Sequence, residues 1–101
     1  MKEDLLKIIN HYGLMESLKY IHSEYFELDE AIMDYRCLKV YNGISSGKYH
    51  KDHIAEEIAD VMNMLKQFQY YYNIKDKQIE DIMKTKVKRE LKRISLESKG
   101  E

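Results

Sequence analysis

Hydrophobic side chains recur along two long stretches of the chain at alternating intervals of four and three residues, which is the spacing of one face of an α-helix. The first stretch runs from Leu14 to Tyr35 and the second from Ile54 to Tyr72. Each pattern predicts a long amphipathic helix whose apolar seam is buried against other helices. The seam residues are Leu14, Leu18, Ile21, Tyr25, Leu28, Ile32 and Tyr35 in the first stretch, and Ile54, Ile58, Val61, Leu65, Phe68 and Tyr72 in the second.

Turn-forming and capping residues divide the rest of the chain. A short amphipathic helix is expected over residues 4–10, with a break at Gly13. The turn-rich segment 42–47 is expected to end the first long helix, and Asp52 is the predicted N-cap of the second. After a short connection, Asp76 is a candidate N-cap for a last helix. We expect that helix to fray from Ser95 onward and to turn five apolar residues inward: Ile79, Met83, Val87, Leu91 and Ile94.

Three long helices and a short N-terminal helix, joined by short turns, predict an all-α antiparallel helical bundle that forms a single domain over residues 1–101. The composition agrees, with 44% hydrophobic and 35% charged residues, four glycines and no proline. A domain of this size buries only about 60–65% of its unfolded surface. We therefore expect oligomerisation to complete the bundle.

Charge and cysteine content bear on the partners and the compartment. The 17 basic and 18 acidic residues nearly cancel, so the total charge gives no argument for a nucleic acid or a membrane surface as the main partner. Cys37 is the only cysteine, which excludes an intramolecular disulfide and favours a reducing compartment. The N-terminus is acidic, unlike a signal peptide, and no apolar run approaches the roughly 20 residues that span a bilayer. We expect a complete, cytoplasmic protein.

Two pairs of acidic residues occupy matching positions beside the two seams: Glu24 with Glu27, and Glu57 with Asp60. Residues three apart are neighbours on a helix surface, so two packed helices can bring all four carboxylates together. Two carboxylates about 5 Å apart repel by roughly 3 kcal/mol at an effective dielectric of about 20. A hard cation, Mg²⁺ or Mn²⁺, is therefore expected among them. The alternative is that the acids are ordinary solvated helix faces.

The order Glu24-x-x-Glu27, a spacer of 29 residues, then Glu57-x-x-Asp60 resembles the motif of the MazG-like all-α nucleoside triphosphate pyrophosphohydrolases, in particular their compact, phage-type members. The resemblance covers nearly the whole chain. It extends to the segments His11–Gly13 and Ala55–Val61. It implies Mg²⁺-dependent hydrolysis of a ribo- or deoxyribonucleoside triphosphate to the monophosphate and pyrophosphate, by a homodimer or homotetramer.

The resemblance also implies roles for particular residues. The metal would be held by the four motif acids, with Mg²⁺ as the cofactor and Mn²⁺ as a substitute. Glu27 or Glu56 would orient or deprotonate the attacking water, and the choice between the two stays open. Cations on the last helix would meet the phosphates. These are Lys86, Arg89 and Arg93.

Two other functions compete with this one. The chain could be a nucleotide-binding or regulatory module of the same fold without turnover. The basic run 84–93 could instead face a nucleic acid, although its charges lie all around the helix and are equally typical of a solvated surface. The histidines share no ligand spacing and are expected to be surface or turn residues. They are His11, His22, His50 and His53.

Overall fold

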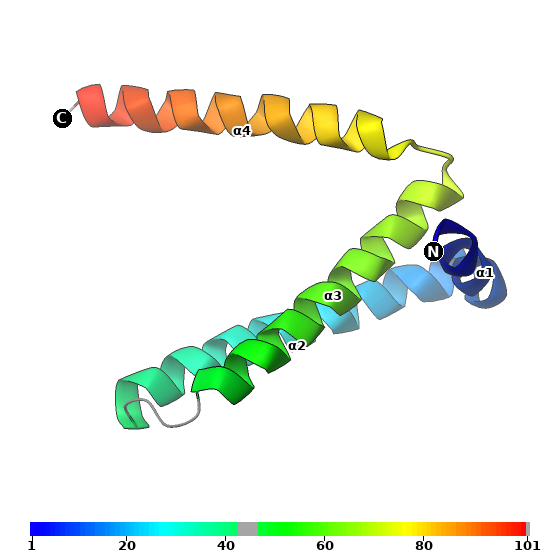
Figure 1. Cartoon of the computed structure of the whole chain (residues 1–101), viewed down its shortest axis with the longest axis horizontal. Coiled ribbons are helices and arrows are strands. Elements are labelled where there is room, and N and C mark those ends of the chain that lie inside the picture. The colour runs from blue at the N-terminus through cyan, green and yellow to red at the C-terminus, as the bar shows by residue number, and fades with distance from the viewer. Residues whose placement is uncertain (43–46, 101) are drawn as a thin grey trace. The chain divides into compact units, whose positions relative to one another are not determined.

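The computed structural model describes the backbone of residues 1–42 and 47–100 and the side chains of residues 1–36 and 50–100. Over these residues every element of regular secondary structure is an α-helix, which confirms the predicted all-α class (Figure 1). The helices are α1 (Lys2–Tyr12), α2 (Leu14–Asn42), α3 (Gly47–Tyr71) and α4 (Asp76–Lys99). The chain divides into two compact units, Met1–Tyr71 and Tyr72–Glu101. The single domain and the complete bundle stay predictions.

The first helix boundary follows the predicted glycine. Gly13 takes a φ of +86°, in the region that residues with a Cβ rarely adopt. Its N–H donates to the carbonyl of Ile9 at 2.8 Å, and its own carbonyl accepts from the N–H of Ser17 at 3.0 Å. One residue therefore ends α1 and starts α2, as predicted.

The predicted N-caps are wrong. Helix α3 begins at Gly47, so Asp52 lies inside the helix. Helix α4 has Lys75 at its N-cap position, and Asp76 is its first helical residue. Asp76 lies in the first turn of α4. The positive end of the helix dipole favours an acidic side chain there even when it makes no capping hydrogen bond. The expected fraying from Ser95 is also wrong, because α4 continues to Lys99. Segment 43–46 of the predicted turn lies outside the described residues.

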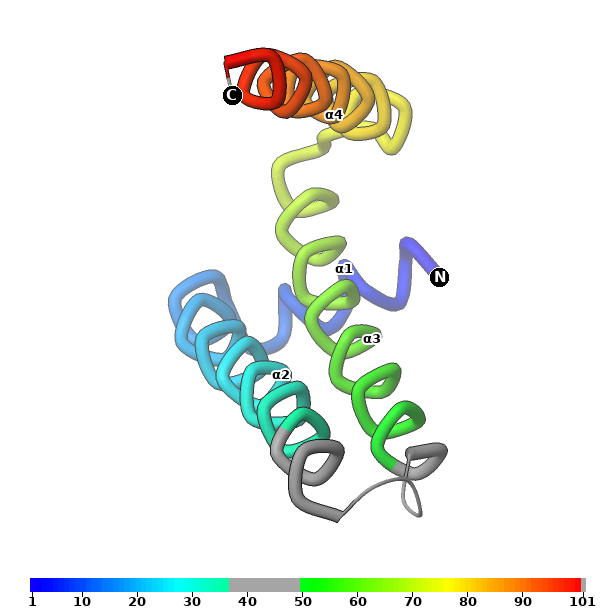
Figure 2. Tube along the Cα trace, turned by 90° about the vertical axis from the view of Figure 1, so that its left-hand side faces the viewer, coloured from blue at the N-terminus to red at the C-terminus, as the bar shows by residue number. Residues whose placement is uncertain are grey.

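The first unit is built on two antiparallel helices. Helices α2 and α3 lie side by side, and α1 packs against both (Figure 2). The buried hydrophobic side chains of the unit are few: Leu5, Ile9, Ala31 and Met64. So small an apolar core leaves the space between α2 and α3 to other kinds of side chain.

The prediction that both seams are buried is wrong. Every second seam residue is exposed, among them Leu18 and Tyr25 on α2 and Ile58 and Leu65 on α3, and the other seam residues on the described side chains are half-buried. The reason is a rotation of each helix. Within α2 and α3, the residue that precedes each exposed seam residue is buried instead: Ser17, Glu24, Ala31, Glu57 and Met64.

Adjacent helical residues differ by about 100° around the axis, so this shift turns the seams away from the contact between α2 and α3. Small and polar side chains, such as Ser17 and Ala31, occupy the contact. Because the shift has the same sense on both helices and the helices are antiparallel, the two seams lie on the same side of the pair. The first unit thus has one apolar side that its own three helices leave open.

Helix α4 has no buried residue among its described side chains. The predicted inward placement of its apolar residues is wrong: Ile79 is half-buried, and Met83, Val87, Leu91 and Ile94 are exposed. The second unit contains only this helix, and a single helix has nothing of its own to bury a face against. None of the described helices is long and apolar enough to cross a membrane. The cytoplasmic location stays a prediction.

Candidate metal centre

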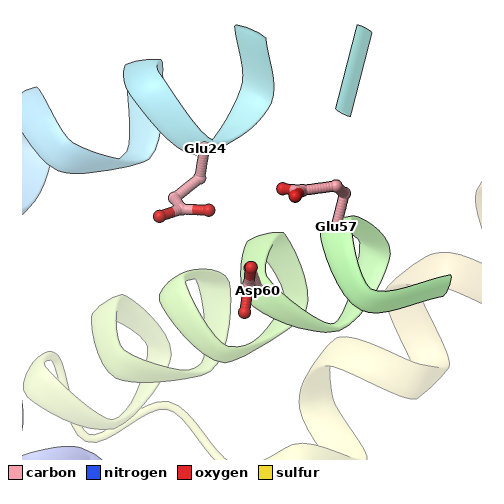
Figure 3. Close-up of side chains that lie close together, drawn as sticks. All are labelled: Glu24, Glu57 and Asp60. Carbon is pink, nitrogen blue, oxygen red and sulfur yellow. The ribbon is translucent and has the colours of Figure 1, made fainter. Parts of the chain in front are cut away.

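Three acidic side chains from two helices converge in the first unit. Glu24 comes from α2, and Glu57 and Asp60 come from consecutive turns of α3 (Figure 3). One carboxylate oxygen of each lies within 4.8 Å of the others. Glu24 and Glu57 are buried, with 6% and 9% of their surface exposed, whereas Asp60 is exposed. The cluster is therefore buried at Glu24 and Glu57 and open to solvent at Asp60.

The heptad register of α2 explains how the cluster forms. Ser17 and Ala31 lie seven residues before and after Glu24 on the line that faces α3. Both are small, so they allow the helices to approach where Glu24 reaches across. On α3, Glu57 occupies the facing line, and Asp60 follows three residues later on the neighbouring row. The backbone geometry of two helices is enough to bring these three carboxylates together.

One oxygen of each buried carboxylate lacks a hydrogen-bond partner. Among the described residues, the Oε2 atoms of Glu24 and Glu57 are buried and accept no hydrogen bond. Burying a charge without compensation is costly, and buried polar groups in folded proteins are almost always satisfied. Burial raises the pKa of the Glu24 carboxyl, the hydrogen bond from Tyr20 opposes this, and the charges of Glu27 and Asp60 raise the pKa further. The site thus favours either a proton or a cation.

Two neighbours of the cluster were not predicted. The Tyr20 hydroxyl donates a hydrogen bond to the Glu24 carboxylate, and that bond together with the carboxylate's charge raises the pKa of Tyr20. His53 was expected to be a surface residue, but it is half-buried. Its Nδ1 lies 3.9 Å from Oε2 of Glu56 and 4.0 Å from Oε1 of Glu57. Each neighbour precedes its buried glutamate by four residues, a spacing that places both on one helix face.

The fourth motif acid and the second candidate base lie at the edge of the cluster. Glu27 is exposed, and its negative charge raises the pKa of Glu24. It is not part of the group of three within 4.8 Å. Glu56 is exposed and lies beside His53. Their predicted roles, as metal ligand and base for Glu27 and as base for Glu56, stay predictions.

The predicted phosphate-binding cations all lie on α4, in the second unit. Lys86, Arg89 and Arg93 are exposed. Arg93 pairs within its own helix, because its Nη1 lies 2.6 Å from Oε1 of Glu90. The role of these three side chains in binding phosphate stays a prediction.

The donor atoms suit a hard cation. Carboxylate oxygens are the protein ligands of Mg²⁺ and Mn²⁺, and Mg²⁺ usually keeps several waters and needs only one or two carboxylates. Two buried oxygens without partners, together with the more exposed Asp60, match that requirement. The cluster contains neither the cysteine nor the set of histidines that is typical of zinc.

Comparisons with protein-family models, with curated proteins and with solved structures give no match to this chain. The resemblance to the MazG-like enzymes therefore rests on the motif residues themselves, and the function has to be argued from the site.

Proposed function

We propose that the protein is a hydrolase, dependent on a divalent cation, that cleaves a nucleoside triphosphate to the monophosphate and pyrophosphate. The observation that carries the proposal is the pair of buried, unpartnered oxygens on Glu24 and Glu57, which converge with Asp60. A cation bound there would neutralise the buried charges and bind both oxygens. The order and spacing of the motif acids supply the reaction class.

Mg²⁺, or Mn²⁺ in its place, would neutralise the triphosphate and lower the pKa of an attacking water when held by Glu24, Glu57 and Asp60. Glu27 and Glu56 lie at the exposed edge of the cluster, where a carboxylate can accept the proton of that water. The water oxygen forms a bond to phosphorus, the α–β anhydride bond breaks, and pyrophosphate leaves with the electron pair. Cations of α4, namely Lys86, Arg89 and Arg93, would stabilise the phosphate charge.

The test is pyrophosphate release from a panel of ribo- and deoxyribonucleoside triphosphates in Mg²⁺. We expect turnover of at least one of them by the unaltered chain. Glu57→Gln keeps the shape of the side chain and removes its charge, and it should abolish turnover. Glu30→Gln makes the same change at an exposed position of α2 outside the cluster, and it should leave turnover unchanged. If no nucleotide of the panel released pyrophosphate at high protein concentration, the proposed enzymatic activity would be refuted.

A second candidate is a nucleotide-binding module of the same fold without turnover. The position of the candidate bases favours it, because Glu56 is close to His53 and Glu27 lies outside the group of three. Calorimetry separates the two functions. Tight, Mg²⁺-dependent binding of a nucleoside triphosphate with no pyrophosphate released would establish the module.

We also propose that the protein is a homo-oligomer, a dimer or a tetramer, in which copies of the first unit meet through the seams. The exposed side chains on this side are large and apolar, with Leu18, Tyr25, Ile58 and Leu65 between 41% and 66% exposed. A contiguous apolar surface of this kind is typical of subunit contacts. Glu24 and Glu57 lie between the two helices, and Glu27 and Asp60 follow them by three residues, on the side away from the seams. Assembly through the seams therefore leaves the metal centre open.

A further inference from the structure

A pocket of about 430 Å³ lies among the three helices of the first unit. The volume is within the roughly 300–1,000 Å³ that is typical of sites for small molecules. Its walls come from all three helices of the unit. The lining residues are Ile8, Tyr12, Glu16, Ser17, Tyr20, Met64 and Gln67.

The pocket lies next to the metal centre along both α2 and α3. Tyr20 lines the pocket, and its hydroxyl donates a hydrogen bond to Glu24. Met64 lines the pocket four residues after Asp60 on α3. Four residues of helix rise by about 6 Å, so on both helices the pocket begins about one turn from the carboxylates. A sugar can bridge that separation, with a group in the pocket on one side and phosphates at the carboxylates on the other.

The chemistry of the walls excludes phosphate and suits a flat, neutral ring. No cationic side chain of the described residues lines the pocket, and the acid Glu16 stands in its wall. Tyr12 and Tyr20 offer aromatic surface that is 63% and 58% exposed. Aromatic side chains stack on nucleobases of any sequence, because every base has a π-face.

Buried polar groups complete the walls. Ser17 and Gln67 are 3% and 4% exposed, and both line the pocket. The Nε2 atom of Gln67 lies 3.7 Å from the sulfur of Met64, and a thioether is only a weak acceptor. A carboxamide carries donors and an acceptor side by side, which is the pattern found on the edge of a base.

We propose that this pocket binds the nucleobase of the nucleotide whose phosphates lie at the metal centre. The inference rests on the proposed function, and it assigns the substrate's recognition to Tyr12, Ser17, Tyr20 and Gln67. The base stacks on Tyr12 or Tyr20. The hydroxyl of Ser17 and the carboxamide of Gln67 form hydrogen bonds with its edge.

The experiment compares two probes by calorimetry in Mg²⁺. One is a set of α,β-methylene nucleoside triphosphates, in which carbon replaces the bridging oxygen that hydrolysis would release. The other is inorganic triphosphate, which has the phosphates and no base. We expect at least one nucleotide analogue to bind tenfold or more tightly than inorganic triphosphate. Equal affinities would overturn the pocket and leave the phosphate site intact, whereas failure of both probes to bind would overturn the proposed function as well.

Matched variants test whether the nucleobase binds in this pocket. Tyr12→Ala removes an exposed pocket ring on α1, outside the two helices that carry the three acids, and Gln67→Met removes the carboxamide at similar volume. Each should lower the affinity for the nucleotide analogue severalfold and leave that for inorganic triphosphate unchanged. Tyr72→Ala makes the same change at a tyrosine of similar exposure, 60%, outside the pocket, and it should alter neither affinity. If Tyr12→Ala, folded as judged by its helicity, bound the analogue normally, the pocket assignment would be wrong.

Discussion

The two sides of the α2–α3 pair are unusual in opposite ways: one buries charged side chains, and the other exposes large apolar ones. Toward the metal centre, Glu24 and Glu57 are buried without partners for their Oε2 atoms. On the seam side, Tyr25 and Leu65 are 66% and 55% exposed. Charged side chains are almost never fully buried unless paired, and large exposed apolar patches are rare on monomers. Each side is therefore incomplete in a single chain.

The difference between the two sides lies in what would complete them. Three carboxylates within 4.8 Å of one another need only an ion. The exposed apolar side chains of the seams would have to be covered over a large area, which only the surface of another macromolecule can do. Because α2 and α3 of one chain already bring the carboxylates together, the geometry of the acidic cluster does not depend on assembly. Cation binding and oligomerisation should respond to separate substitutions.

The largest expected effect is stabilisation of the first unit by Mg²⁺ at neutral pH. A ligand that binds only the folded state at about 100 times its dissociation constant adds about 2.7 kcal/mol to the free energy of unfolding. Thermal unfolding in Mg²⁺ and in a chelator, at matched ionic strength, measures the gain. Glu57→Gln should remove it and Glu30→Gln should keep it. An equal gain in the two variants would contradict a metal centre at Glu57.

What could be predicted from the sequence follows from local geometry. The helical period and Gly13 were enough for the all-α class and the first boundary. The spacing of Glu57 and Asp60, set against the register of Glu24, was enough to bring these acids together, because residues three apart on a helix are neighbours whatever surrounds them.

Which face of each helix is buried, and where the pocket lies, depend on how the helices pack together. The spacing of apolar residues does not specify that packing. Ser17 and Leu18 are adjacent in sequence, and a turn of about 100° decides which of them faces α3. The apolar pattern favoured Leu18, but the structure buries Ser17. The pocket required the position of α1, which supplies Ile8 and Tyr12 to its walls. No spacing along α2 or α3 contains that information.

The second prediction tests the seam side. Leu65→Glu places a charge in the proposed subunit contact and should weaken assembly by about 2 kcal/mol, the scale of an interface hot spot, or roughly thirtyfold in the dissociation constant. Light scattering over a concentration series measures the mass. Asn63→Glu adds the same charge to an exposed polar position of α3 and should preserve the oligomer. The Leu65→Glu variant should still gain stability from Mg²⁺, and a joint loss of both properties would refute the independence of the two sides.

The third prediction concerns the chain without a cation. Glu57→Gln removes a buried charge that has no partner for Oε2, so in a chelator the variant should be more stable than the unaltered chain by about 1–2 kcal/mol. Urea unfolding followed by circular dichroism gives the difference. Glu56→Gln changes an exposed carboxylate next to it and should have little effect. Destabilisation by Glu57→Gln would mean that the carboxylate contributes to folding rather than to cation binding.

The smallest expected effect is the pH dependence that Glu24 gives to stability in a chelator. Burial raises the pKa of this carboxyl in the folded chain, so between its unfolded and folded pKa values the folded state binds more protons. The free energy of unfolding then falls as pH rises through that interval. Glu24→Gln lacks this titration. The stability difference between Glu24→Gln and the unaltered chain should therefore be small at about pH 4, near the ordinary pKa of glutamate, and grow in favour of the variant toward neutral pH.

Mg²⁺ should reverse the sign of this dependence. The ion competes with the proton for the carboxylate, so it stabilises the unaltered chain most where Glu24 is ionised. Urea unfolding at several pH values, with and without Mg²⁺, provides both series for the unaltered chain and for Glu24→Gln. A difference between them that stayed constant with pH in the chelator would show that Glu24 has the same pKa in the folded and the unfolded chain. Its negative charge would then be compensated within the chain, and the need for a cation that sets this side of the helix pair apart from the seam side would disappear.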